Sequence, residues 1–450
     1  MSTKNDSFNR RDFFRLTGAA AVGGALVGLG PKALTAAGLV RAEKRPWWDL
    51  GIMGESVTDN QLLFYLGQAR DGATDIGECL DTVSRIDRSD PWSWPRAWSA
   101  TAERVAAVAE NCRARGHKLS AGDAYLRAAA YYRAALIHHT VPTDASVAQM
   151  ALREDECFGS ALELQGQPAR AVRIPYEGTM LPGYFWRSPV AAGRAPVIIV
   201  HQGRDAWPED TMYVARGAIR RGYHCLMVHC PGQGLAIRVQ GLPFRPDWEK
   251  VITPVVDFVM TQPEVDPAAI VLMGLSMGGA LAPRAAAFEK RIKVCIANPG
   301  VLNWGEAIWA HLNAYPPLMK LLDTNPGAFD RAVWGVFRAG SVAGGLLLSG
   351  ERWLRDSMWK HGAKTPSEML AQLKQFDNTS IVGRITCKML VMDGEAEEFS
   401  AGQARKLYDA LQCPKDYMLF TAEDTGLVHC QVGASAVAEQ RVFDWLEENL

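Results

Sequence analysis

The stretch AAIVLMGLSMGGALAPRAAAFE, residues 268–289, decides the fold. An apolar run leads into Gly274-Leu275-Ser276-Met277-Gly278, and an alanine-rich helical run follows. The pattern G-x-S-x-G between a strand and a helix predicts a tight turn that lifts the serine hydroxyl away from the sheet. Residues two positions either side of that serine must lack bulk, which the glycines provide. We therefore interpret Ser276 as a candidate nucleophile at the start of a helix, whose N–H groups favour developing negative charge.

Apolar strand-like runs alternate with helical runs on both sides of this motif, from about residue 170 onward. Such alternation predicts an α/β fold with a doubly wound, mostly parallel sheet. Residues 170–189 are typical of a β-hairpin that precedes it. Six further strands are expected within residues 195–203, 223–234, 268–279, 292–300, 387–394 and 416–424.

Two regions fall outside this alternation. Residues 46–168 have helical periodicity throughout and predict an N-terminal helical cap in front of a catalytic domain at 169–450. Residues 301–380 are too long for an ordinary connection between two elements, so we expect a helical cap insertion before the penultimate strand. It would lie over the carboxyl edge of the sheet, where open α/β folds bind ligands. Trp304, Trp309 and His311 in this insertion are candidate substrate-pocket residues.

The first 42 residues are expected to be a targeting segment that is separate from the folded domain. Arg10 and Arg11 precede Phe13 and a Gly/Ala-rich, weakly apolar run, a pattern that resembles a twin-arginine (Tat) signal peptide. We expect export by the Tat machinery to a periplasmic or secreted location, and no stable membrane span. The whole chain of 450 residues has a formal net charge of −1, which gives no sign of a nucleic-acid partner. The spacing of the nine cysteines does not match that of a disulfide framework, so buried free thiols are expected by default. A homodimer remains possible as the oligomeric state.

Several motifs together resemble a known family. They are PGQG (231–234), GLPFRPDWEKVITPVVDF (241–258), GLSMGGALAPRAAAFE (274–289), FDWLEENL (443–450) and the helical AYLRAAAYYRAAL (124–136). From about residue 50 onward, the chain is similar to α/β-hydrolases. More narrowly, it resembles serine hydrolases with an N-terminal helical cap, the group that includes 2,6-dihydropseudooxynicotine hydrolase and FrsA-like proteins. The sequence departs from the group at His229-Cys230, where related proteins often have Asp-Gly before PGQG.

The resemblance implies a catalytic triad in the order Ser, acid, His along the chain. His429 follows a late strand and precedes the final helix, so it is the expected base. The family places the acid three residues after the loop glycine, and counting from Gly394 this position is Glu397. Glu398 and Asp424 remain alternative acids.

An oxyanion hole needs two N–H donors close to the nucleophile. One is expected from Met277 and the other from the loop after VIIVHQG, at Arg204 or Gln202. The Arg204 side chain could meet an acidic substrate or be solvated. His224 and His229 would point to opposite faces of a strand, which argues against a metal site. We expect neither a metal nor another cofactor.

The expected reaction is hydrolysis of an ester or amide in a hydrophobic or aromatic small molecule, through an acyl-enzyme. Hydrolysis of a carbon–carbon bond in a ketone, and acyl transfer or cyclisation, remain open. A binding protein that kept the fold without catalysis is a further alternative. The presence of serine, histidine and carboxylate candidates argues against it.

Overall fold

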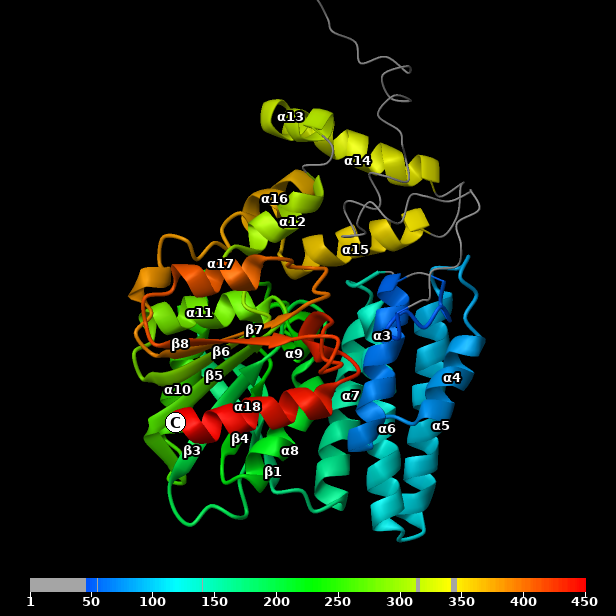
Figure 1. Cartoon of the computed structure of the whole chain (residues 1–450). Coiled ribbons are helices and arrows are strands. Elements are labelled where there is room, and N and C mark those ends of the chain that lie inside the picture. Colours follow the sequence, from blue (N-terminus) through cyan, green and yellow to red (C-terminus); the bar gives the residue numbers. More distant parts are fainter. Residues whose placement is uncertain (1–45, 55, 140, 313–315, 341–345) are drawn as a thin grey trace, which may run out of the picture.

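A computed structural model describes residues 46–450 apart from 55, 140, 313–315 and 341–345, and omits the side chains of 56, 309–312, 338–340 and 346–349 (Figure 1). The proposed Tat segment, residues 1–42, lies outside the described residues. No helix within the described part of the chain is long and apolar enough to cross a membrane.

Eight strands form one sheet in the order β1-β2-β4-β3-β5-β6-β7-β8. Strand β2 pairs antiparallel with both β1 and β4, and all the other neighbouring strands are parallel. The predicted hairpin and mostly parallel sheet are thus confirmed. The strands are β1 (Ala169–Tyr176), β2 (Thr179–Trp186), β3 (Ala195–His201), β4 (His224–Val228), β5 (Val265–Leu275), β6 (Ile292–Asn298), β7 (Lys388–Gly394) and β8 (Lys415–Phe420).

Helices cover both faces of the sheet, which explains why its central strands are apolar at nearly every position. Val197 and Ile199 of β3 belong to one hydrophobic core, whereas Ile198 and Val200 belong to the other. The first core includes residues of α10 (Glu249–Met260), α11 (Gly278–Phe288) and α17 (Gln403–Ala410), and the second includes residues of α8 (Met212–Arg220) and α18 (Ser435–Asn449).

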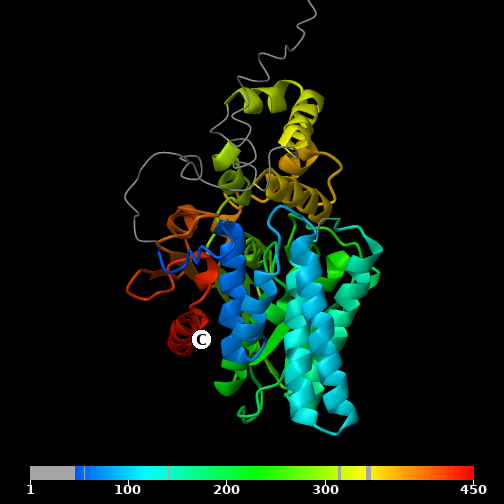
Figure 2. The same cartoon turned by 90° about the vertical axis from the view of Figure 1, so that its right-hand side faces the viewer.

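The N-terminal helices pack on the second core, beside the sheet (Figure 2). Long helices α5, α6 and α7 lie side by side, and α3 lies between them and the end of the chain's last helix (Figure 1). Helix α6 begins at Lys118 and has no side-chain cap at its start. The helices are α3 (Ser56–Gly67), η2 (Gln68–Asp71), α4 (Ile76–Ser84), α5 (Ser93–Ala114), α6 (Lys118–Ile137) and α7 (Ala145–Leu164).

Among the described residues between β6 and β7, five helices lie above the carboxyl ends of the parallel strands (Figure 1). They are α12 (Trp304–Leu312), α13 (Pro316–Thr324), α14 (Pro326–Gly340), α15 (Leu346–Lys360) and α16 (Pro366–Leu373). Short elements η3 (Pro208–Thr211), α9 (Gly234–Arg238), η4 (Val382–Arg384) and η5 (His429–Gln431) complete the connections.

Candidate active site

Ser276 occupies the turn between β5 and α11 with a backbone φ of 57°, in the left-handed region that non-glycine residues rarely adopt. Its neighbours are close enough to need glycine. A Cβ at Gly274 would lie 2.1 Å from the Gly278 carbonyl oxygen, and one at Gly279 would lie 1.8 Å from that of Pro299. Because these glycines have no side chain, neighbouring backbone can contact the turn that presents Ser276.

His429 and Glu397 complete a hydrogen-bonded chain that begins at this serine. The Ser276 hydroxyl lies 2.9 Å from His429 Nε2, and His429 Nδ1 lies 2.9 and 2.8 Å from the two carboxylate oxygens of Glu397. Because Nδ1–H donates to the carboxylate, Nε2 is left to accept the serine proton. Glutamate reaches the histidine although aspartate is the shorter and more usual acid.

The surroundings stabilise charge on this pair. Burial raises the pKa of Glu397, but His429 and the N–H groups of Ser400 and Phe399 outweigh burial and hold that pKa below its ordinary value. Burial lowers the pKa of His429, whereas Cys430 and Glu397 raise it, and the net shift is upward. Glu397 therefore remains a carboxylate and favours the protonated form of His429.

The other carboxylates predicted as alternatives lie elsewhere. Glu398 is exposed and makes no hydrogen bond to His429 within the described part of the chain. Asp424 accepts from the Thr421 N–H and pairs with Arg441 at 3.0 Å.

The loop after β3 lies directly against the nucleophile turn. A Cβ at Gly203 would lie 2.6 Å from the Met277 nitrogen and 2.6 Å from the Leu275 carbonyl oxygen. The backbone N–H groups of Met277 and Arg204 donate no hydrogen bond within the described residues. The two expected donors thus belong to adjoining segments of the chain.

The Arg204 side chain is buried, so the expectation that it is solvated is wrong, and it lies in the wall of the cavity beside Ser276. Its guanidinium donates to Asp356 at 2.6 Å and to Ser357 at 2.7 Å, and it stacks on Trp353 at 5.0 Å. All three partners belong to α15, so this arginine joins the β3 loop to the helical insertion.

A cavity of about 210 Å³ opens beside Ser276 and His429. Three parts of the chain line it: the sheet edge, the insertion and one face of α3. Trp304 lies in its wall as predicted, and the side chains of Trp309 and His311 lie outside the described residues. The α3 face was not predicted, although its helical spacing was present in the sequence: Val57, Asn60, Gln61, Phe64 and Gly67, followed by Gln68 of η2.

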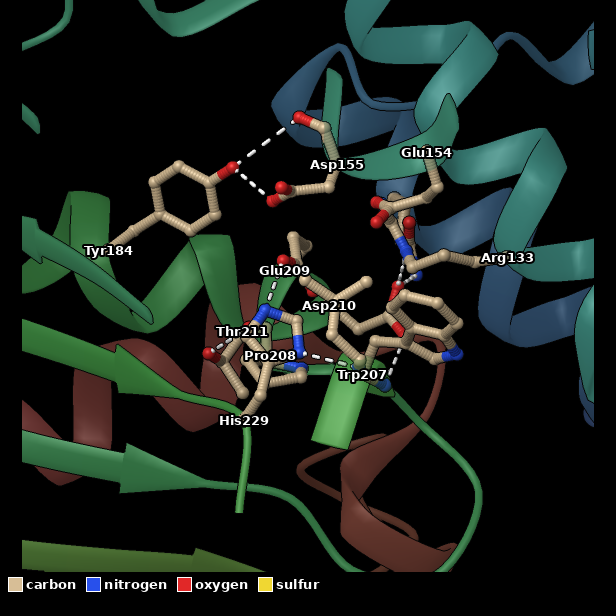
Figure 3. Close-up of polar contacts among 12 residues, drawn as sticks. Arg133, Glu154, Asp155, Tyr184, Trp207, Pro208, Glu209, Asp210, Thr211 and His229 are labelled. Carbon is tan, nitrogen blue, oxygen red and sulfur yellow. Dashed lines mark hydrogen bonds and ion pairs between the residues drawn. The ribbon is translucent and has the colours of Figure 1, made fainter. Parts of the chain in front are cut away.

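A buried ionic cluster fastens the N-terminal helices to the wall of this cavity (Figure 3). Arg133 of α6 donates to Glu154 of α7 at 2.6 Å and to Asp210 of η3 at 2.8 Å. Asp210 also accepts the Trp207 N–H at 2.8 Å, which fixes the start of η3. The arginine thereby connects helices α6 and α7 to the segment that follows the β3 loop.

The two histidines near β4 have unrelated surroundings. His229 accepts the Leu235 N–H at its Nδ1 and faces Glu209 at 2.8 Å through Nε2 (Figure 3). His224 accepts the Ser188 N–H, 3.0 Å away. No group of three metal-ligand side chains occurs among the residues that the structure describes, and all nine cysteines are free thiols there.

Known proteins share this architecture. The family model described as "Alpha/beta hydrolase family" matches residues 197–438, and a model described as "Esterase FrsA-like" matches residues 68–304. Hydrolase LUC6 of a Fusarium species is 31% identical, with 86% of this chain and 95% of that protein aligned. The 20-hydroxy-prefusarin hydrolase FUS2 of Gibberella moniliformis is 30% identical, with coverages of 86% and 95%.

Among solved structures, the crystal structure of 2,6-dihydroxy-pseudo-oxynicotine hydrolase aligns with a TM-score of 0.63 at 19% identity, over 86% of this chain and 95% of that one. The structure of AbyA5 aligns with a TM-score of 0.55 at 15% identity, over 85% and 90%. These two likenesses confirm the fold. The sequence matches, which extend over most of the chain, show that it belongs to the alpha/beta hydrolase family and is an enzyme, a hydrolase.

Proposed function

We propose that this enzyme is a serine hydrolase that cleaves an ester or amide in a small, mainly apolar molecule. The observation that supports this most is the continuous hydrogen-bonded series from Ser276 through His429 to Glu397, which opens onto a cavity. Each member has the neighbour that its role requires: a base beside the nucleophile and a carboxylate beside the base.

In the proposed reaction His429 removes the proton from Ser276 as its Oγ attacks the substrate carbonyl. The same proton then passes to the leaving group, and an acyl-enzyme forms. Water, deprotonated by His429, releases the acid product. Glu397 holds the imidazole ring in the required tautomer and stabilises the imidazolium ion.

Negative charge on the carbonyl oxygen would be stabilised by the N–H groups of Met277 and Arg204. Loss of one such donor typically costs about 3–4 kcal/mol of transition-state stabilisation. The apolar part of the substrate would contact Trp304, Ile308, Trp353 and Phe399, which line the cavity.

Cleavage of a carbon–carbon bond next to a ketone is the second candidate, because Tyr213 also lines the cavity. That reaction leaves a carbanion, which needs a proton. Burial raises the pKa of Tyr213, so its hydroxyl stays protonated. It could give its proton to the carbanion and regain one from the His429 imidazolium, which returns both groups to their starting forms.

A fluorophosphonate probe tests the proposed nucleophile. We expect the purified wild type to be labelled, Ser276→Ala to be unlabelled, and the exposed-residue control Glu398→Gln to label like wild type. The Ser276→Ala change should lower kcat/KM for any hydrolysed ester by at least about a thousandfold. A wild type that neither labels nor hydrolyses esters, amides or β-diketones would overturn the proposal.

The same set of ester, amide and β-diketone substrates distinguishes ester or amide hydrolysis from carbon–carbon bond cleavage. Turnover of p-nitrophenyl esters or anilides supports the first candidate. Turnover of β-diketones alone, lost in Tyr213→Phe, supports the second.

A further inference from the structure

Four carboxylates line the cavity, and they differ in how fully they are already bonded. They are Asp71, Asp205, Glu209 and Asp210. Asp210 is bonded by Arg133, by the Trp207 N–H and by Gln68 at 3.1 Å, and Glu209 faces His229 (Figure 3). Asp210 therefore has little capacity left for a ligand. Among the described residues, Glu209 pairs with His229 through one oxygen only, and because its side chain is fully buried a ligand has less access to it than to Asp205.

Asp205 has one oxygen bonded and one unused. Its Oδ1 accepts from Arg204 and, at 3.0 Å, from Lys360. No hydrogen bond or ion pair to Oδ2 occurs within the described part of the chain, and 46% of the side chain is exposed. Burial raises the pKa of Asp205, but Arg204 and Lys360 outweigh it and hold the pKa below its ordinary value. An ionised oxygen is thus available at the cavity wall.

Charge around Asp205 is already balanced. Arg204 and Lys360 face Asp205 and Asp356, with Lys360 lying 2.9 Å from Asp356 and fully buried. The charges of these four side chains sum to zero. A cationic ligand would add an uncompensated positive charge beside them, which is costly away from water. A neutral hydrogen-bond donor would satisfy the free oxygen without that cost.

We propose that Asp205 Oδ2 accepts a hydrogen bond from a hydroxyl group of the substrate. The substrate class is then a mainly apolar carbonyl compound that carries a hydroxyl away from the bond that is cleaved. This inference rests on the proposed function, because it assigns a second binding group in the same cavity. Asp205 directly follows Arg204, so one loop would bind both the reacting carbonyl and the hydroxyl group.

Asp71 supplies a matched control because it is a less suitable acceptor in the same cavity. Its carboxylate lies 4.0 Å from Arg216, and its side chain is 15% exposed. Burial raises the pKa of Asp71 above its ordinary value.

The test uses p-nitrophenyl esters with straight acyl chains of several lengths that end in a methyl, a hydroxyl or an ammonium group. At the length that reaches Asp205, wild type should prefer hydroxyl over methyl by about tenfold in kcat/KM, as expected for a hydrogen bond to a charged group. Ammonium chains should be the poorest substrates. Asp205→Ala should lose the preference, and Asp71→Asn should keep it.

Because Asp205→Ala leaves two cations beside one carboxylate, the double change Asp205→Ala/Lys360→Met is included. It restores one cation opposite one carboxylate, and it should also lack the preference while remaining folded by circular dichroism. Binding of the methyl and hydroxyl esters to Ser276→Ala, followed by calorimetry, gives a readout that needs no turnover.

The two proposals fail differently. If wild type hydrolysed the methyl, hydroxyl and ammonium esters at equal rates and Ser276→Ala bound them equally, the Asp205 assignment would be overturned. The serine hydrolase proposal would then still hold. Absence of hydrolysis with a retained binding preference for the hydroxyl ester would do the reverse. A preference for ammonium chains would also contradict the assignment.

Discussion

Glu397 and His429 determine the pH at which the proposed base becomes available. His429 must be neutral to remove a proton, so activity appears as pH rises through its pKa. Glu397 raises that pKa. In Glu397→Gln the pKa of His429 should fall, and the acid limb of kcat/KM should move to lower pH. The maximal rate should fall by about ten-thousandfold because the tautomer is no longer fixed. A pH–rate profile with the best p-nitrophenyl ester measures both effects.

Glu398→Gln is the neighbouring control, since Glu398 is exposed and makes no hydrogen bond to the histidine within the described part of the chain. It should leave the plateau rate within a factor of about two. If Glu397→Gln kept wild-type turnover while Glu398→Gln or Asp424→Asn lost it, the acid would have been misassigned.

Single residues were predictable from the sequence where a motif fixes the spacing between neighbours. Ser276 follows from G-x-S-x-G, and Glu397 from its distance to Gly394. The pairing of Asp205 with Lys360 could not be predicted in this way. These residues lie 155 positions apart and meet only because α15 folds over the β3 loop.

At the level of helices and strands, Arg133 joins α6, α7 and η3 through buried ion pairs. Its side chain is 1% exposed, with Glu154 and Asp210 as partners. Removing the cation leaves buried carboxylates without a counter-charge. Arg133→Met should therefore lower the free energy of unfolding by about 3–5 kcal/mol. Urea denaturation followed by circular dichroism measures this loss.

Arg127 of the same helix is the matched control. It pairs with Glu78 at 3.0 Å, but its side chain is 25% exposed. Arg127→Met should cost at most about 1 kcal/mol. Equal losses in the two variants would show that burial of the Arg133 cluster contributes no extra stability.

The elements themselves were largely predictable, because a strand buried on both faces is apolar throughout and a helix repeats every three to four residues. The residues at which the helices and strands begin and end were less predictable. Helix α6 starts at Lys118 without a side-chain cap, so no capping residue marks its first turn in the sequence. A charged residue in an alanine-rich helix, such as Arg133, also gives no sign in the sequence of which partners it will meet.

Across the whole molecule, the cavity exists only where the N-terminal helices, the insertion and the sheet edge meet. The sequence indicated the two helical regions and predicted that the insertion lies over the carboxyl edge of the sheet. It did not indicate the contacts that hold each region there, such as Arg204 with α15 and Arg133 with η3. A substrate bound at Ser276 should therefore be sensitive to residues more than two hundred positions earlier in the chain.

Phe64 of α3 tests this dependence, because it lines the cavity but belongs to the N-terminal helices. Phe64→Ala removes apolar contact with the substrate and leaves the reacting groups in place. KM for p-nitrophenyl esters should rise by about three- to tenfold, with kcat nearly unchanged. Val108→Ala, at an exposed position of α5 outside the cavity lining, should change neither constant. A fall in kcat at constant KM in Phe64→Ala would instead mean that α3 holds the catalytic groups in position rather than binding the substrate.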